Sequence, residues 1–269
     1  SEIAAHNFKQ LAILNIETIS ENGLEYLKKS TEIFDVIYID PSRRNDVKEK
    51  VFLLKDCEPN IPENIDLLFK KTKTILLKNS PILDITSAIN ELKFVKEIHV
   101  VAINNDVKEL LYILEKGYCK EILIKTINFT KKSAQKFHFN YHKKPVSSYQ
   151  EPLEYLYEPN AAVLKSGAFH EISTQLNIFK LHQHSHLYTS KKRIEFPGRE
   201  FKIIAVLPYD KKQILKLLPN KKANITIRNF HKTVAQIRKE LKIKDGGDSF
   251  LFFTTNIHNK FICMYCKKL

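Results

Sequence analysis

The order of apolar and polar positions divides the first 128 residues into alternating strands and amphipathic helices. Short apolar runs predict strands at residues 15–20, 34–40, 73–79 and 97–104. Apolar positions three and four apart predict helices at residues 24–30, 61–71, 82–93 and 107–117. This alternation is typical of an α/β domain with a parallel sheet and crossover helices. Residues 122–129 and 134–142 predict a hairpin that closes the sheet.

A second pattern begins after a polar stretch with two prolines that ends at residue 152 and predicts a linker. A helix should start after Pro159, and Pro197 with Gly198 predicts a turn between strands. Near the C-terminus, Thr233 and Gln236 form a capping box before an apolar helical stripe, and the sequence DGGD should stop that helix. Together with a strand at 225–230 and a hairpin from 249 to 266, this predicts a small β-α-β-β unit.

The charge of the chain is unevenly distributed. Residues 1–100 hold 14 Lys and Arg against 16 Asp and Glu, whereas residues 101–269 hold 30 against 14. A basic part joined to a neutral part favours a module that meets phosphates beside one with another role, although solubility alone is the alternative. No apolar run reaches the roughly 18 residues of a membrane span, and no secretory signal is present at the start. A cytoplasmic protein without a membrane partner is the expectation.

Two groups of residues invite a metal interpretation, and neither is favoured. Cys263 and Cys266 form one CxxC pair without a second pair to complete four ligands, and on a strand the two would face opposite sides. His182, His184 and His186 would share one face if their segment were extended, but a polar strand or loop is the simpler interpretation. We therefore expect no metal, and reduced thiols rather than a disulfide framework.

The strongest chemical signal is FDVIYIDPSRR, residues 34–44. In open parallel sheets ligands bind outside the carboxyl ends of the strands, and Asp40 ends the most apolar strand of the chain. Pro41 ends the strand's hydrogen bonding, and Arg43 and Arg44 follow. A carboxylate there could accept a hydrogen bond or a proton, and the arginines could hold phosphate. The alternative is a strand-ending turn with solvated arginines.

These residues resemble a known family. IYIDPSRR is similar to the fourth motif of class I S-adenosylmethionine-dependent methyltransferases, IAAHNFKQL to the helix after their second strand, and LLKNSPILDI to the strand that follows the motif in one subgroup. In that subgroup a ferredoxin-like and a THUMP-like domain follow, which YEPNAAVLKSGAF to FPGREF and then ITIRNF and DGGD resemble. The resemblance implies a methyltransferase region at 1–145, a linker at 146–152, a ferredoxin-like domain at 153–198 and a THUMP-like domain at 199–269.

The resemblance also implies roles for particular residues. Asp40 and Pro41 would line the methyl-transfer site, and Arg43 and Arg44 would face substrate or brace the motif. Glu21 or Asn22 would contact the adenine of S-adenosylmethionine, unless both are turn residues. In the family, a glycine-rich cofactor loop and an acidic residue for the ribose precede the helix that IAAHNFKQL resembles. Neither is present in this chain, whose first glycine is Gly23. We therefore expect an incomplete Rossmann-like domain, with weak or absent cofactor binding by this chain.

The function expected from these features is methyl transfer to RNA, either tRNA or rRNA. The basic part of the chain would position the RNA, and the candidate phosphate contacts are Arg199, Arg228, Lys232 and Arg238. One alternative is an RNA-binding protein with a methyltransferase fold that no longer catalyses a reaction. A weaker one is a methyltransferase for small molecules or proteins. The acceptor atom and the oligomeric state stay open.

Overall fold

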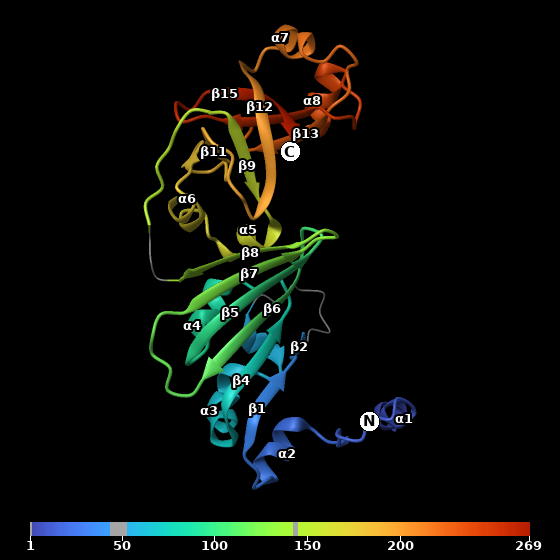
Figure 1. Ribbon diagram of the computed structural model, residues 1–269. Coiled ribbons are helices and arrows are strands. Elements are labelled where there is room, and N and C mark those ends of the chain that lie inside the picture. The colour runs from blue at the N-terminus through green and yellow to red at the C-terminus, as the bar shows by residue number, and fades with distance from the viewer. Residues whose placement is uncertain (1, 44–52, 142–144) are drawn as a thin grey trace. The chain divides into compact units, whose positions relative to one another are not determined.

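The computed structural model describes residues 2–43, 53–141 and 145–269, and the chain divides into two compact units (Figure 1). Unit 1 comprises residues 1–96 and 112–119, and unit 2 comprises residues 97–111 and 120–269. One sheet has six strands in the order β1-β4-β6-β5-β7-β8. A seven-stranded sheet lies in unit 2, in the order β10-β11-β9-β12-β15-β14-β13.

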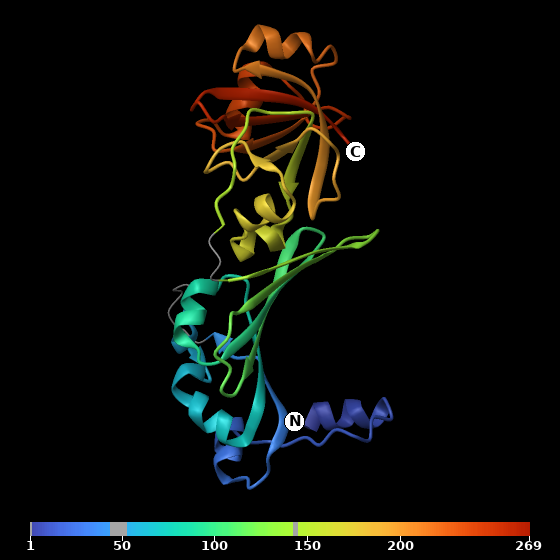
Figure 2. The same cartoon turned by 60° about the vertical axis from the view of Figure 1, so that its left-hand side comes forward.

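Unit 1 is built around a parallel pair of strands. Its elements are α1 (Glu2–Gln10), α2 (Gly23–Lys29), β1 (Phe34–Ile39), β2 (Ser42–Arg43), η1 (Leu54–Asp56), β3 (Cys57–Glu58), α3 (Ile61–Lys71), β4 (Thr72–Asn79) and α4 (Ile85–Glu91). β1 and β4 run parallel, with Phe34 opposite Thr72 and Ile39 opposite Leu77. Because α3 connects them, they form the crossover unit that the sequence predicted, and Figure 2 shows α3 and α4 on the same face of the sheet.

The helix α3 illustrates how local sequence sets an element of this unit. The Asn60 side chain accepts a hydrogen bond from the backbone nitrogen of Glu63 at 3.2 Å, and Pro62 occupies the first turn, where its missing N–H costs nothing. Ile61, Ile65, Leu68 and Phe69 form one buried stripe. The buried stripe packs the helix against the sheet, and β4 begins directly after the last residue of the helix.

The helix predicted at residues 107–117 is wrong, because residues 106–115 form a strand. β5 (Val95–Ile103) and β6 (Asp106–Glu115) are joined only by Asn104 and Asn105, whose φ angles are 49° and 66°. Two consecutive residues with positive φ are the geometry of a two-residue hairpin turn, which Asn tolerates. Leu110, Tyr112 and Leu114 are buried in alternation along β6, which is the period of a strand.

The predicted strand at residues 15–20 is also wrong. This segment has no regular secondary structure, and Ile16 and Ile19 are exposed. A strand needs a neighbour to complete its backbone hydrogen bonds, and within the described ranges no strand pairs with these residues. A run of apolar residues alone is therefore insufficient to predict a strand in this segment.

Unit 2 contains the hairpin and both small α+β regions. Its remaining elements are β7 (Leu123–Phe129), β8 (Ala134–Asn140), β9 (Tyr155–Pro159), α5 (Ala161–Ser166), α6 (Glu171–Gln175), β10 (Phe179–Lys180), β11 (Tyr188–Ser190), β12 (Gly198–Pro208), α7 (Lys211–Lys216), β13 (Asn224–Arg228), α8 (Val234–Leu241), β14 (Phe250–Thr255) and β15 (Phe261–Lys268). β7 runs parallel to β5 and antiparallel to β8, which confirms the closing hairpin.

The long strand β12 joins the two regions into one sheet. Its first half pairs with β9, and most of its length pairs with β15. At its start, Gly198 lies so close to the backbone of Glu158 that an added Cβ would be only 2.1 Å from the carbonyl oxygen of that residue. Of the predicted turn, Pro197 lies in a bend and Gly198 already begins β12. Glycine is needed there because two backbones approach closely, and not because of an unusual φ.

The C-terminal β-α-β-β unit has the predicted order and capping. β13 pairs in parallel with β14, β14 pairs antiparallel with β15, and Thr233 and Gln236 form the complete capping box of α8. The helix ends at Leu241, followed by Lys242 with φ 55°, before the DGGD sequence is reached. Cys263 packs in one apolar core and Cys266 in the core on the other side, as predicted for a strand.

Candidate active site and basic surface

Asp40 follows the last residue of β1, at the carboxyl end of the parallel pair. Because Ile39 pairs with Leu77, the next residues, Asp40 and Lys78, are neighbours, and their charged atoms lie 2.7 Å apart. Half of the Asp40 side chain is exposed. The carboxylate is thus held by a cation from the adjacent strand while one side stays open to solvent. The sequence placed Asp40 at this edge, but its pairing with Lys78 depends on strand register and could not be read from the sequence.

The residues after Asp40 leave the sheet in a small antiparallel pair. Pro41 is half-buried, and Ser42 and Arg43 form β2, which pairs with Glu58 and Cys57 of β3. The Ser42 hydroxyl donates a hydrogen bond to the carbonyl oxygen of Glu58 at 3.3 Å. Arg44 lies outside the described residues, so the substrate roles of Arg43 and Arg44 stay predictions.

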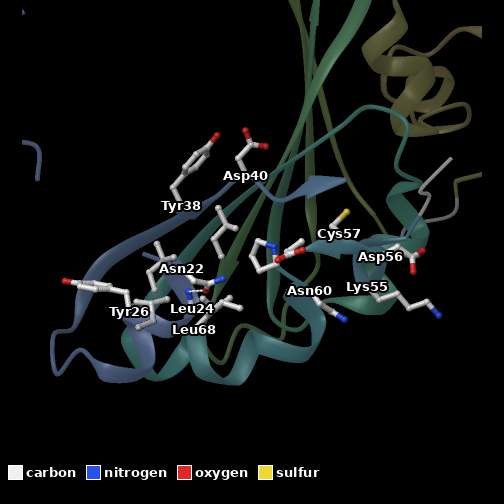
Figure 3. A pocket seen from close by; sticks show the side chains of 16 residues that line it. Asn22, Leu24, Tyr26, Tyr38, Asp40, Lys55, Asp56, Cys57, Asn60 and Leu68 are labelled. Atoms are coloured by element: carbon white, nitrogen blue, oxygen red, sulfur yellow. Dashed lines mark hydrogen bonds between the residues drawn. The ribbon is translucent and has the colours of Figure 1, made fainter. Parts of the chain in front are cut away.

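A cavity of about 730 Å³ lies beside β1 in unit 1. Its walls come from α2, β1, α3 and the segment 55–60, and Figure 3 shows the side chains that line it. Leu24 and Leu68 lie below the strand, whereas Tyr38 and Asp40 project from β1 on the opposite side, so Asp40 belongs to the rim. The sequence did not point to Cys57, which lies in β3, or to Asn60, the N-cap of α3, because neither belongs to a recognisable motif.

The two candidate cofactor contacts have structural roles in this unit. Asn22 is the N-cap of α2, and its side-chain oxygen accepts hydrogen bonds from the backbone nitrogens of Leu24 at 2.9 Å and Glu25 at 3.3 Å. Glu21 forms an exposed ion pair with Lys29 at 3.5 Å. Asn22 also lines the cavity. Cofactor contact by either residue stays a prediction.

The cavity has the character of a small-molecule site. Its volume lies within the range of about 300–1,000 Å³ common for ligand pockets, and its walls are mainly apolar with a few polar groups at the edge. These residues fit a nucleoside-like ligand, which needs apolar walls around a flat ring and a few hydrogen-bonding groups. The exposed carboxylate on the rim could accept a hydrogen bond or a proton from a second molecule.

Two of the predicted phosphate contacts in unit 2 converge on one buried carboxylate. Glu158 is almost fully buried, and Arg199 binds one of its oxygens through Nε at 2.6 Å and also through Nη2. Nη2 of Arg228 lies 2.5 Å from the other oxygen, in an ion pair without hydrogen-bond geometry. Both arginines stay more than one third exposed. The cluster therefore fixes two guanidinium groups at the surface. The sequence did not reveal it, because its three residues lie on three different strands.

The other two predicted phosphate contacts, Lys232 and Arg238, are held by ion pairs with neighbouring carboxylates. Lys232 is paired with Glu240 at 2.6 Å and lies over the ring of Tyr209. Arg238 pairs with Asp245 and donates to the carbonyl oxygen of Ala223, and only 23% of its side chain is exposed. RNA contact by any of the four residues stays a prediction, but Arg199 and Arg228 present the more accessible guanidinium groups.

The histidines of the HQHSH segment do not share one face of a strand. The segment forms a turn between β10 and β11, His182 is buried, and the ring of His186 stacks on Phe169 at 3.8 Å. No cluster of three or more potential metal ligands occurs in the part of the chain that the structure describes.

Burial raises the pKa of the Cys263 and Cys266 thiols, which makes both unreactive. Among the described helices, none is long and apolar enough to cross a membrane.

Comparison with known proteins gives matches over the C-terminal regions and over the whole chain. Residues 155–197 match a ferredoxin-like domain family and residues 198–268 match a THUMP-like domain family. The crystal structure of a "putative methyltransferase" from Porphyromonas gingivalis W83 superposes with a TM-score of 0.86 and 31% sequence identity, over 99% of this chain and 68% of that chain. The chain belongs to this methyltransferase family. The chain combines a mixed α/β fold with ferredoxin-like and THUMP-like regions at the C-terminus. The comparison with curated proteins gave no match.

Proposed function

We propose that the protein transfers a methyl group from S-adenosylmethionine to RNA. The observation that carries the proposal is the position of Asp40 and Pro41 at the carboxyl end of β1, beside the cavity, in a chain of this methyltransferase family. The THUMP-like match and the basic surface of unit 2 support RNA as the acceptor.

The chemistry asks little of the protein beyond binding and positioning. S-adenosylmethionine supplies an electrophilic methyl group on a sulfonium centre. Asp40 would accept a hydrogen bond from the attacking group of the acceptor, or take its proton, and so aim its lone pair. Lys78 forms an ion pair with the Asp40 carboxylate at 2.7 Å and so helps to position it, and Pro41 fixes the backbone as it leaves the strand.

A transfer assay with three acceptor classes tests the proposal. The full-length protein is incubated with S-adenosylmethionine labelled on the methyl group, together with total cellular RNA, a protein extract or a small-molecule extract. Label in the RNA fraction, abolished by ribonuclease, is expected. Label in the protein or small-molecule fraction would instead identify that class as the methyl acceptor. Absence of label from all fractions, with RNA still bound, would favour an RNA-binding protein that has lost catalysis.

A further inference from the structure

A hollow of about 620 Å³ on unit 2 combines aromatic, amide and imidazole side chains. It is formed where the turn after β10 meets the end of β13 and the β14–β15 hairpin, and its lining residues are His182, Gln183, His184, Asn229, Phe230, His231, Thr255, Asn259 and Phe261. None of them is acidic. Only His182 and Thr255 among them are buried, so most of this lining is open to a ligand.

The buried His182 has one possible protonation pattern. Its Nδ1 accepts a hydrogen bond from the backbone nitrogen of His184 at 3.1 Å, and a backbone N–H can only donate. Nδ1 therefore carries no proton, and the proton of the neutral ring lies on Nε2. Two amides contact this ring, Asn229 at Nδ1 (3.0 Å) and Asn259 at Nε2 (3.1 Å).

This pattern fixes the orientation of both amides. Asn229 must donate through Nδ2 to Nδ1 of His182, which leaves its Oδ1 as an acceptor for a ligand. Asn259 must accept through Oδ1 from Nε2, which leaves its Nδ2 as a donor. Within the described ranges neither of these two remaining atoms has a partner. Thr255 also donates to the backbone oxygen of Asn229 at 2.6 Å, which anchors that residue.

The other side of the hollow is an aromatic wall. The Phe261 ring lies 4.2 Å from His231 and 5.1 Å from Phe230, between ring centroids, and 42% of Phe261 is exposed. An exposed aromatic ring beside a fixed acceptor and a fixed donor is suited to a flat heterocycle, which stacks on the ring and hydrogen-bonds through its edge. The cationic residues Arg228, Lys232 and Lys260 directly flank lining residues in sequence, which favours a ligand with a phosphate backbone.

We propose that this hollow binds an unpaired nucleobase of RNA, stacked on Phe261 and read by Asn229 and Asn259. The base edge must offer a donor and an acceptor, as the Watson–Crick edges of all four RNA bases do, so the hollow should admit any unpaired base. A base within a duplex cannot enter, because its faces are stacked and its edge is paired. The inference rests on the proposed function for RNA as the bound polymer, and it adds the recognition of a single-stranded position.

Binding of fluorescent RNA oligonucleotides to the full-length protein tests the stacking. Phe261→Ala should weaken binding of single-stranded RNA by about fivefold or more, whereas binding of the same sequence as a duplex should not change. Phe261→Trp should retain the wild-type affinity, which separates loss of the ring from loss of the fold. Phe129→Ala is the matched control, because Phe129 is similarly exposed but lies outside the hollow.

Asn259→Gly tests the edge recognition. Asn259 has φ 58°, a conformation that glycine adopts freely, so the variant removes the amide without straining the turn. It should weaken binding of single-stranded homopolymers by about fivefold, because one hydrogen bond to the base edge is lost, while leaving the dependence of binding on salt unchanged. Equal affinity of wild type and Phe261→Ala for single strands would overturn the inference and leave the proposed function standing. Absence of any RNA binding at low salt would overturn both.

Discussion

At the scale of single residues, the buried carboxylate of Glu158 organises the surface of unit 2. Arg199 and Arg228 approach it from different strands, β12 and β13, so one side chain ties these strands together with its own strand β9. The cluster carries two positive charges for one negative charge. Because both guanidinium groups stay partly exposed, the excess charge faces solvent and is available to an anion.

Glu158→Gln should lower the free energy of unfolding by about 1–3 kcal/mol. The amide keeps the shape of the carboxylate but leaves two arginines next to each other without a counter-charge. The measurement is the urea midpoint, with Glu154→Gln as the control. Glu154 pairs with Lys202 and 60% of its side chain is exposed, and such a surface pair contributes at most about 1 kcal/mol. Equal shifts for both variants would show that burial of Glu158 does not matter.

At the scale of elements, strand and helix assignment from sequence succeeded where a segment also carried a boundary signal. The residues of α3 have a cap and a proline at the start, and β1 ends at Ile39 directly before Asp40 and Pro41, so pattern and boundaries agree. For β6 the apolar positions 110, 111 and 114 fit either period, and only the two-residue turn before it decides for a strand. The candidate site was predictable at Asp40 for the same reason. The cavity beside it was not, because distant segments build it.

The helix α8 depends on its N-terminal cap. Thr233 accepts from the backbone of Gln236 at 3.2 Å, and the side chain of Gln236 accepts from the backbone of Thr233 at 2.8 Å. Thr233→Ala should therefore destabilise the protein by about 1 kcal/mol in a urea titration. Thr233→Ser keeps the hydroxyl and should restore most of this loss. A full loss in the serine variant would attribute the effect to the methyl group instead.

The turn between β10 and β11 should make the protein sensitive to acid. Burial, together with nearby Lys180, lowers the pKa of His186 to about 4, whereas an unfolded histidine titrates near 6.5. Between these pH values the unfolded chain binds more protons than the folded one, so the free energy of unfolding falls as the pH drops from about 6.5 towards 4. His186→Asn suits the φ of 50° and should flatten this dependence, as measured by Tm against pH. His138→Asn, at an exposed histidine, should leave the dependence of Tm on pH unchanged.

At the scale of the whole molecule, a neutral N-terminal part with the candidate active site is joined to a strongly basic part. If the basic part holds RNA, the logarithm of the binding constant should fall linearly with the logarithm of the salt concentration, by about 0.7–0.9 for each phosphate contact. Arg228→Ala should reduce the magnitude of this slope by about one contact without changing sequence preference. Arg238→Ala should change it less, because that side chain is mostly covered and engaged. A slope near zero in the wild type would attribute the positive charge to solubility.

The most direct test of the account compares methyl transfer to RNA by full-length protein carrying Asp40→Asn with transfer by wild type. We predict a rate lower by about 10²-fold or more with S-adenosylmethionine binding nearly unchanged, because the carboxylate acts on the acceptor. Asp35→Asn on the same strand is the control, and it should leave the rate within about twofold of wild type, since its exposed side chain lies away from the carboxyl end of β1. A rate unchanged by Asp40→Asn would contradict the account and reduce Asp40 to a partner of Lys78 at the end of a strand.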